Sequence, residues 1–445
     1  IESLPAEILT YIFEMAVDDE AVFSWAVPTS MKESYWDVRR GEFVLIDPIT
    51  DLHVKQRRKY AMTKSLMLTS RHWYQLAYHL LFQTIFISDS ADIPAVCIAF
   101  ERTEDLGWYV QRLHVVRWYE PRGLSMSHLS AMLVSIIQQC PNLILFTVEW
   151  SLMTAFPDVA NSLSMFASHT LRSLHVNLTP NHLSRFIWAL ECLPELFSVH
   201  VDITTQAGVE YEPAEITPRL GAASNLSLEL PHLQQLSFRG YVQALLEQTC
   251  GWSLPALRAV TIDLGSQLND IPDILAFLTV QGTTLLFLDL NIIPTVDIAG
   301  VLARCPFLNS FAFSADWRLP FHDAEPPGSL PFVHAPHAHL RHIGLHQLLH
   351  AFHPPRGDAA ISAVQRINDT TFAQLTKKNF PNLTLVRVLS RPLLAALERN
   401  NGPEEDEGLA RWQRWDRQCQ LAGIRLEDCT GAPLGELPED EDSLE

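Results

Sequence analysis

Histidine is concentrated in one short stretch of this chain of 445 residues, which has 18 histidines in all. In a helix, three of them would share one face at positions i, i+4 and i+7, a spacing compatible with metal ligation. No cysteine or carboxylate joins this helical set, so the pattern favours a solvated face of neutral imidazoles over a metal site or a pH-dependent contact with a partner. The sequence therefore predicts no metal site and no cofactor. The stretch contains His334, His337, His339, His342, His346, His350 and His353, of which the last three form the helical set.

Other residue types that carry out chemistry show no motif. The seven cysteines are widely spaced and include no CxxC pair, which argues against a locally built zinc ribbon or thioredoxin-like motif. Cys140, Cys192 and Cys305 fall at expected helix ends, where packing in the core is favoured over a reactive thiol. The sequence contains no GxGxxG, GK[ST], HExxH or GxSxG motif. We therefore expect no catalytic residue and a protein that is not an enzyme.

The composition predicts a folded protein with an excess of negative charge. Hydrophobic residues make up 47% of the chain, and 32 Lys and Arg against 51 Asp and Glu give a net charge of −19. This charge argues against nucleic-acid binding, which requires basic residues, and the basic cluster at residues 55–59 is short. The most apolar stretch, residues 274–293, is interrupted by Gln281 and Asp289, so no membrane span is expected. A cytoplasmic or nuclear location is therefore favoured.

A short phrase recurs along the middle of the chain. An apolar anchor, usually Leu, is followed by two residues, an apolar residue, one further residue and another apolar residue, as in residues 143–148. The ten copies lie on average about 30 residues apart, and six follow an X-Pro pair that would end a preceding helix. Apolar stripes of helical period, such as Leu129, Leu133 and Ile137, lie between copies. One such unit cannot cover its own apolar face, so stacked units are expected. The anchors are residues 110, 143, 171, 196, 233, 257, 285, 308, 340 and 383.

The repeated phrase resembles leucine-rich repeats of the ribonuclease-inhibitor-like, cysteine-containing type. Residues 139–143 (QCPNL) and 304–308 (RCPFL) match the part of that family's repeat in which a helix ends in Cys-Pro before the strand. The resemblance covers about residues 108–390. It implies an α/β fold, a leucine-rich-repeat solenoid with parallel strands on its concave side.

The N-terminal region contains two further phrases. The chain has LPAEIL at residues 4–9, and LMLTSRHWYQL at residues 66–76 is followed by LLFQTI at residues 80–85. With these phrases in this order, the region resembles an F-box. The two phrases are about twice as far apart as in the family. Residues from about 18 to 60 are therefore expected to be an insertion of the kind found in fungal F-box proteins.

This second resemblance implies a small all-α F-box module that docks a Skp-type adaptor and, through it, a cullin–RING ubiquitin ligase. A small helical module cannot bury so many apolar groups by itself, which agrees with a partner site. The alternative is a helical cap that seals the open end of the repeats. The residues that the resemblance assigns to adaptor binding are Leu4, Pro5, Ile8, Leu9, Ile12, Phe13, Leu68, Trp73, Leu80 and Leu81.

The region beyond the repeats combines an aromatic helix with an acidic tail. Trp412, Trp415 and Cys419 share a helical spacing and are expected to pack as a cap over the last repeat, with a docking helix for a partner as the alternative. Acidic residues dominate from residue 404 onward, which predicts a solvated tail. The expected domains are the F-box module (1–90, with the insertion at about 18–60), the solenoid (91–395), and the C-terminal cap and acidic tail (396–445).

Together these features predict the substrate-recognition subunit of a Skp–cullin–F-box ubiquitin ligase. The F-box would hold the adaptor while the repeats hold a protein substrate, which raises the effective concentration of substrate lysines near the conjugating enzyme. The alternative is a leucine-rich-repeat scaffold unrelated to ubiquitin. Substrate contacts are expected from side chains that point out of the strands and are exposed on the concave face. These side chains are Arg172, His175, His200, Gln235, Arg258, Thr261, Asp289, Arg341 and Arg387.

Overall fold

The computed structural model divides into two compact units. The first unit comprises residues 1–27 and 49–257, and the second comprises residues 28–48 and 258–445. The residues that the structure describes are 4–17, 19–39, 42–103, 105–204, 220–264, 273–293, 297–316, 332–351, 359–391, 394 and 407–433.

A parallel sheet runs through the first unit. Its strands in the described residues are β3 (Thr84–Ile87), β4 (Arg112–Val115), β5 (Leu145–Ser151), β6 (Ser173–Leu178), β7 (Ser198–Ile203) and β8 (Gln235–Gly240). They are hydrogen-bonded to one another in the order in which they occur in the chain.

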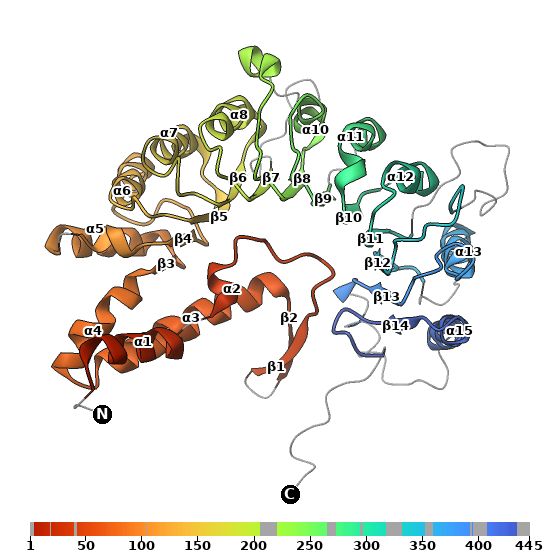
Figure 1. Ribbon diagram of the computed structural model, residues 1–445, viewed down its shortest axis with the longest axis horizontal. Coiled ribbons are helices and arrows are strands. Elements are labelled where there is room, and N and C mark those ends of the chain that lie inside the picture. The colour runs from red at the N-terminus through yellow and green to blue at the C-terminus, as the bar shows by residue number, and fades with distance from the viewer. Residues whose placement is uncertain are drawn as a thin grey trace, which may run out of the picture. The chain divides into compact units, whose positions relative to one another are not determined.

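The helices that connect these strands lie along one face of the sheet (Figure 1). They are α5 (Ile93–Arg102), α6 (Met126–Gln138), α7 (Phe156–Phe166), α8 (Leu183–Glu191) and α10 (Gln243–Thr249). Short 3-10 helices occur at η1 (Ser90–Asp92), η2 (Leu106–Tyr109), η3 (Met153–Ala155), η4 (Pro180–His182) and η5 (Gly221–Asn225).

The repeated phrase sets where each strand begins. The anchor Leu143, two residues before β5, is buried, and so are Phe146 and Val148 within the strand. The N–H of Cys140, just after α6, donates to the carbonyl of Ile137, and burial raises the pKa of the Cys140 thiol to about 12. A protonated, buried thiol agrees with a packing role.

The second unit repeats the same strand-and-helix pattern. Its parallel strands are β9 (Ala259–Asp263), β10 (Phe287–Asn291), β11 (Ser310–Ser314), β12 (His342–His346), β13 (Leu385–Val388) and β14 (Arg425–Glu427), paired in chain order. The helices are α11 (Ile274–Gln281), η6 (Gly282–Thr284), α12 (Ile298–Arg304), α13 (Ala359–Gln374) and α15 (Glu407–Leu421). An antiparallel hairpin of β1 (Tyr35–Arg39) and β2 (Glu42–Ile46) also belongs to this unit.

Helix α15 packs against α13 through its aromatic face. The rings of Trp415 and Phe372 are stacked with centroids 4.0 Å apart, and Trp412, Trp415 and Cys419 are buried. Strand β14 follows α15 and pairs with β13. The acidic tail predicted from residue 404 falls partly at 404–406 and 434–445, outside the described residues.

The N-terminal helices precede the sheet of the first unit in the chain. They are α1 (Ala6–Val17), α2 (Glu20–Phe23), α3 (Pro48–Met67) and α4 (Arg71–Phe82). Helix α4 begins at a capped turn, because the Ser70 hydroxyl accepts a hydrogen bond from the N–H of Trp73.

The prediction of an α/β fold with parallel strands in chain order is confirmed. Each of the ten phrases forms a strand, from β4 to β13, and β3 and β14 are added before and after them in the described part of the chain. The expectation of a buried Cys192 is wrong, since this thiol is exposed.

The helix that would place the three histidines on one face does not form at His346. His346 is the last residue of β12, and the next two residues, Gln347 and Leu348, have positive φ angles of 65° and 59°, which no α-helix accommodates. His350 lies beyond this turn, and His353 is outside the described residues.

Candidate functional site

Helix α1 presents an inner face that is anchored in the first unit. Leu9, Phe13 and Val17 are buried and form one cluster with Ala77 and Leu80 of α4. The cluster is extended by Trp73, whose ring centroid lies 4.7 Å from that of Phe13. The helix is therefore held in place by one side only.

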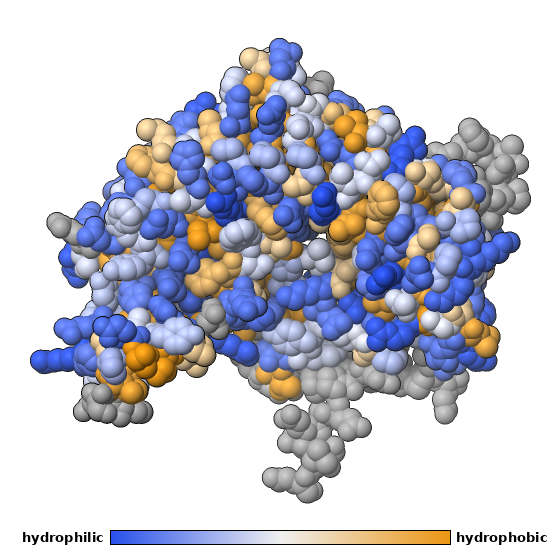
Figure 2. Space-filling view, in the orientation of Figure 1, coloured by the Kyte–Doolittle hydropathy of each residue, from blue (hydrophilic) through white to orange (hydrophobic). Residues whose placement is uncertain are grey.

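The outer face of α1 is apolar as well, and it is exposed. Leu4, just before the helix, and Ile8, Tyr11, Ile12 and Met15 within it are exposed by 40%, 47%, 60%, 44% and 64%. Figure 2 shows hydrophobic side chains gathered where Figure 1 places α1. A run of large exposed apolar residues on one helix face is typical of a protein-binding surface.

The structure divides the predicted adaptor-binding residues into two groups. Leu4, Pro5, Ile8, Ile12 and Leu68 are exposed. Leu9, Phe13 and Leu80 are buried in the cluster, and Trp73 and Leu81 are half-buried. Sequence reasoning missed Tyr11 and Met15, although their helical spacing from Ile8 and Ile12 was a usable signal.

Part of the segment between α1 and β1 lies against the sheet of the first unit. We call residues 19–34 the strap. Val27 exchanges two backbone hydrogen bonds with the Gln235 amide, at 2.8 and 2.9 Å, and the Arg112 guanidinium donates to the carbonyl of Val22 at 2.8 Å. Trp25 packs edge-on against Phe197.

The strap makes comparable contacts within the second unit. The Arg387 guanidinium donates to the carbonyl of Met31 and to the Glu33 carboxylate, the latter at 2.8 Å. The Ser30 hydroxyl donates to Asp289. A Cβ atom on Gly344 would lie 2.6 Å from the Met31 sulfur, so the Met31 side chain lies directly against this glycine.

These contacts explain which of the predicted substrate-binding side chains are exposed and which are buried. The expectation that they are exposed is met by Arg258 and Arg341. It is wrong for Gln235, Asp289 and Arg387, which are buried because the chain's own strap binds them. The half-buried members are Arg172, His175, His200 and Thr261.

Two clusters of histidine and carboxylate lie on the polar face of the first unit. In the first, Nε2 of His53 from α3 and Nε2 of His114 from β4 both donate to Oε1 of Glu149 in β5, at 2.6 and 2.8 Å. The Gln56 amide donates to Nδ1 of His114 at 2.9 Å. Burial lowers the pKa of His114 to about 4. Burial alone would raise the pKa of Glu149, but the hydrogen bonds from both histidines hold it below its ordinary value.

The second cluster joins His175 of β6 to His200 and Asp202 of β7. His175 and His200 are direct partners in the parallel register, and their ring centroids are 4.1 Å apart. Nε2 of His200 lies 3.2 Å from Oδ1 of Asp202, and Nε2 of His175 lies 3.6 Å from Oδ2. Burial would raise the pKa of Asp202, but the two histidines lower it.

Sequence reasoning singled out His175 and His200 but missed the other members of both clusters. The usable signal was the position four residues after each phrase anchor, which His114, Thr147, His175 and His200 share. The register aligns these four residues across β4, β5, β6 and β7. Equal positions in consecutive repeats are neighbours in a parallel sheet.

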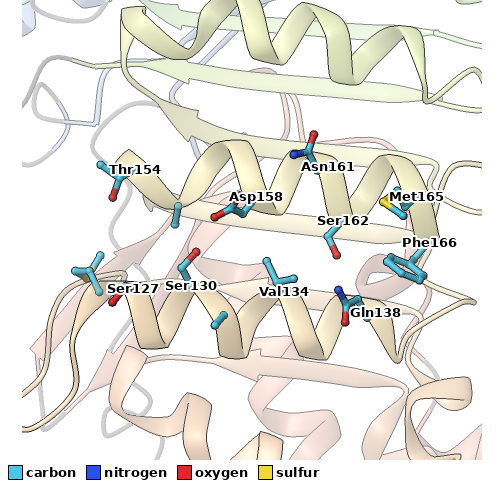
Figure 3. A pocket seen from close by; sticks show the side chains of 13 residues that line it. Ser127, Ser130, Val134, Gln138, Thr154, Asp158, Asn161, Ser162, Met165 and Phe166 are labelled. Carbon is cyan, nitrogen blue, oxygen red and sulfur yellow. The ribbon is translucent and has the colours of Figure 1, made fainter.

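A groove lies between α6 and α7 on the helical face of the first unit. Figure 3 shows Ser130, Val134, Asp158 and Ser162 lining it, with Phe166 at one end. Asp158 is the one charged residue of its lining. The lining therefore offers no second ionisable side chain beside Asp158.

Comparisons with known proteins leave the family of the chain open. No protein-family model and no curated protein matches the sequence. Among solved structures, it is similar to a structural-genomics crystal structure of a protein from Bacteroides fragilis, with 10% identity and a TM-score of 0.38 over 91% of this chain and 95% of that one. In the described part of the chain, no helix is both long and apolar enough to span a membrane.

Proposed function

We propose that this protein is the substrate-recognition subunit of a Skp–cullin–F-box ubiquitin ligase, a non-catalytic receptor in the cytoplasm or nucleus. Helix α1 and its neighbours act as the F-box module and bind a Skp-type adaptor. The observation that carries the proposal is the exposed apolar outer face of α1, on a helix whose inner face is anchored.

The energetics of that face support a protein partner. A large apolar side chain that is about half exposed would contribute about 1 kcal/mol when a partner covers it. Ile8, Tyr11, Ile12 and Met15 present such side chains along one helix. A plain cap would have packed this face on the repeats, whereas here the face is exposed and the opposite face of α1 packs on α4.

The substrate side of the proposal rests on two exposed residues that immediately precede strands β9 and β12 of the second unit. Arg258 and Arg341 are exposed, whereas Gln235, Asp289 and Arg387 hold the strap. A substrate would therefore meet guanidinium groups, which bind carboxylates or phosphates in a bidentate manner. An acidic protein segment is the substrate class that these residues favour.

The test measures adaptor affinity while the inner cluster is left intact. Ile8→Asp and Ile12→Asp place a charge on the outer face, whereas a change at Trp73 would also disturb Phe13. Met165→Asp is the matched control, because Met165 is an exposed apolar residue of α7 with 73% exposure. Binding of a purified Skp-type adaptor is recorded by biolayer interferometry, and folding by circular dichroism.

We expect the parent and Met165→Asp to bind alike and each α1 variant to bind at least about tenfold more weakly, which corresponds to about 1.4 kcal/mol. If the folded parent binds no Skp-type adaptor, the chain is a repeat scaffold whose N-terminal helices serve another partner. If both α1 variants bind like the parent, the docking face lies elsewhere.

A further inference from the structure

We propose that His175, His200 and Asp202 bind a divalent transition-metal ion of the zinc type, with the remaining coordination position open to water. This site is separate from the adaptor-binding face and does not depend on it. Two imidazole nitrogens and one carboxylate are a ligand set that zinc and related ions accept, with water as a further ligand.

The strand geometry brings the three ligands together without help from a loop. His175 and His200 stand opposite each other in adjacent parallel strands. Asp202 follows His200 by two residues, so its side chain leaves the same face of β7. The backbone of a sheet therefore holds all three groups, which is the rigid support that a metal site needs.

The ligand atoms of the three residues lie close enough together to reach one ion. One ligand atom from each of the three residues lies within 4.8 Å of the others, and the two imidazole-to-carboxylate distances are 3.2 and 3.6 Å. Ligand atoms bound at about 2.0–2.2 Å around a tetrahedral ion are separated by roughly 3.3–3.5 Å. The two imidazole-to-carboxylate distances are therefore within a few tenths of an ångström of those around a bound ion.

A buried nitrogen supplies an independent argument. Nε2 of His175 is buried without a hydrogen-bond partner among the described residues, and at 3.6 Å from Asp202 it is beyond hydrogen-bond length. Buried polar atoms are normally satisfied by a protein group, water or an ion. A cation bound between His175 and Asp202 would use the free lone pair of the imidazole.

The local charge also favours a cation. The Asp202 carboxylate is buried. The negative charge of Glu149, in the adjacent strand β5, is also close enough to attract a cation held by His175. Oxygen ligands alone would suit magnesium or calcium, but two imidazoles select borderline ions such as zinc, cobalt or iron(II).

The neighbouring cluster of His53, His114 and Glu149 provides the contrast. Its distances of 2.6 and 2.8 Å are those of hydrogen bonds and are too short for two ligands of one ion. The Gln56 amide also binds the other nitrogen of His114. This cluster is closed by its own hydrogen bonds, so a His114 variant is the matched control.

The experiment titrates cobalt(II) into the full chain, purified without a histidine tag and stripped of metal with EDTA. Visible absorption bands of the bound ion report coordination by protein ligands, and competition with zinc gives the zinc affinity. The variants are His175→Gln and Asp202→Asn, with His114→Gln as the control. Thermal unfolding of each metal-free variant shows whether it folds, and His200→Gln replaces any variant that does not.

We expect one cobalt ion per chain in the parent and in His114→Gln. In the ligand variants we expect the cobalt affinity to fall by more than about a hundredfold, because even the loss of a residue that only hydrogen-bonds a metal ligand costs about 10–100-fold. A parent that binds no cobalt at this stoichiometry overturns the proposal. So does binding that survives in both ligand variants, because the ion would then occupy other histidines, such as the exposed His334 and His339. Equal loss in His114→Gln would likewise overturn it.

Discussion

The guanidinium of Arg387 donates a 2.7 Å hydrogen bond to the carboxylate of Glu427, and both side chains are buried. The pair joins β13 to β14, and the same guanidinium binds the strap at Met31 and Glu33. Arg387, which the sequence analysis assigns to substrate binding, therefore stabilises the second unit by linking β13, β14 and the strap.

Removal of one member of this pair should destabilise the protein strongly. Arg387→Met leaves the Glu427 carboxylate buried without its main cation, and such a break costs about 3–5 kcal/mol. The double variant Arg387→Met/Glu427→Leu should recover part of that loss, because no uncompensated charge remains. Chemical denaturation measures the unfolding free energies, with Arg341→Met as the exposed control and an expected change within about 0.5 kcal/mol. Equal small losses at both arginines would contradict this tie.

His114 should make the first unit sensitive to mild acid. Burial lowers its pKa from 6.5 to about 4, so between these pH values the unfolded chain binds a proton that the folded chain excludes. The contribution of His114 to stability is therefore complete above about pH 6.5, decreases as the pH falls and changes no further below about pH 4. The whole shift corresponds to about 3 kcal/mol.

Denaturation of the parent and of His114→Gln between pH 7 and pH 4, in EDTA, isolates this contribution. The parent should lose more stability than the variant over that interval. Parallel pH profiles of the two proteins would exclude His114 as the source of the acid sensitivity.

The two faces of α1 should respond differently to truncation. Phe13→Ala removes a buried ring that packs on Trp73 and should cost about 3–5 kcal/mol in stability. Ile12→Ala, one residue earlier on the exposed face, should change stability by no more than about 0.5 kcal/mol. Thermal unfolding of both variants tests this division. A large loss in Ile12→Ala would mean that the outer face is packed in solution.

The C-terminal helix should depend on one aromatic stack. Trp415→Ala removes the ring that lies on Phe372 and the Nε1 donor to Asp369, so a loss of about 3–5 kcal/mol is expected. Leu421→Ala, at the exposed end of the same helix, should be close to neutral. Limited proteolysis that releases α15 from the Trp415 variant, and not from the Leu421 variant, would report the same effect.

Much of the fold could be predicted because it is periodic. The phrase around Leu143 places β5, and the stripe from Leu129 to Ile137 falls inside α6. Each unit buries its apolar face against the next copy, so a local pattern carries the information about the stacking.

The strap could not be predicted, since its contacts follow no period. Val27 binds the amide of Gln235, which is 208 residues away in the chain, and Met31 binds Arg387 at a separation of 356 residues. Single contacts between a backbone group and a distant side chain produce no repeated pattern in the sequence. For this reason, residues expected to face a substrate proved to be buried by the chain itself.

The most direct test of the central proposal places a photoreactive benzoylphenylalanine at Tyr11, which is 60% exposed on the outer face of α1. The control carries the same group at Trp188 of α8, which is 40% exposed. After irradiation of the full chain with a purified Skp-type adaptor, the proposal predicts a crosslinked product from position 11 and none from position 188. An adaptor that binds but crosslinks from neither position, or only from position 188, would contradict it.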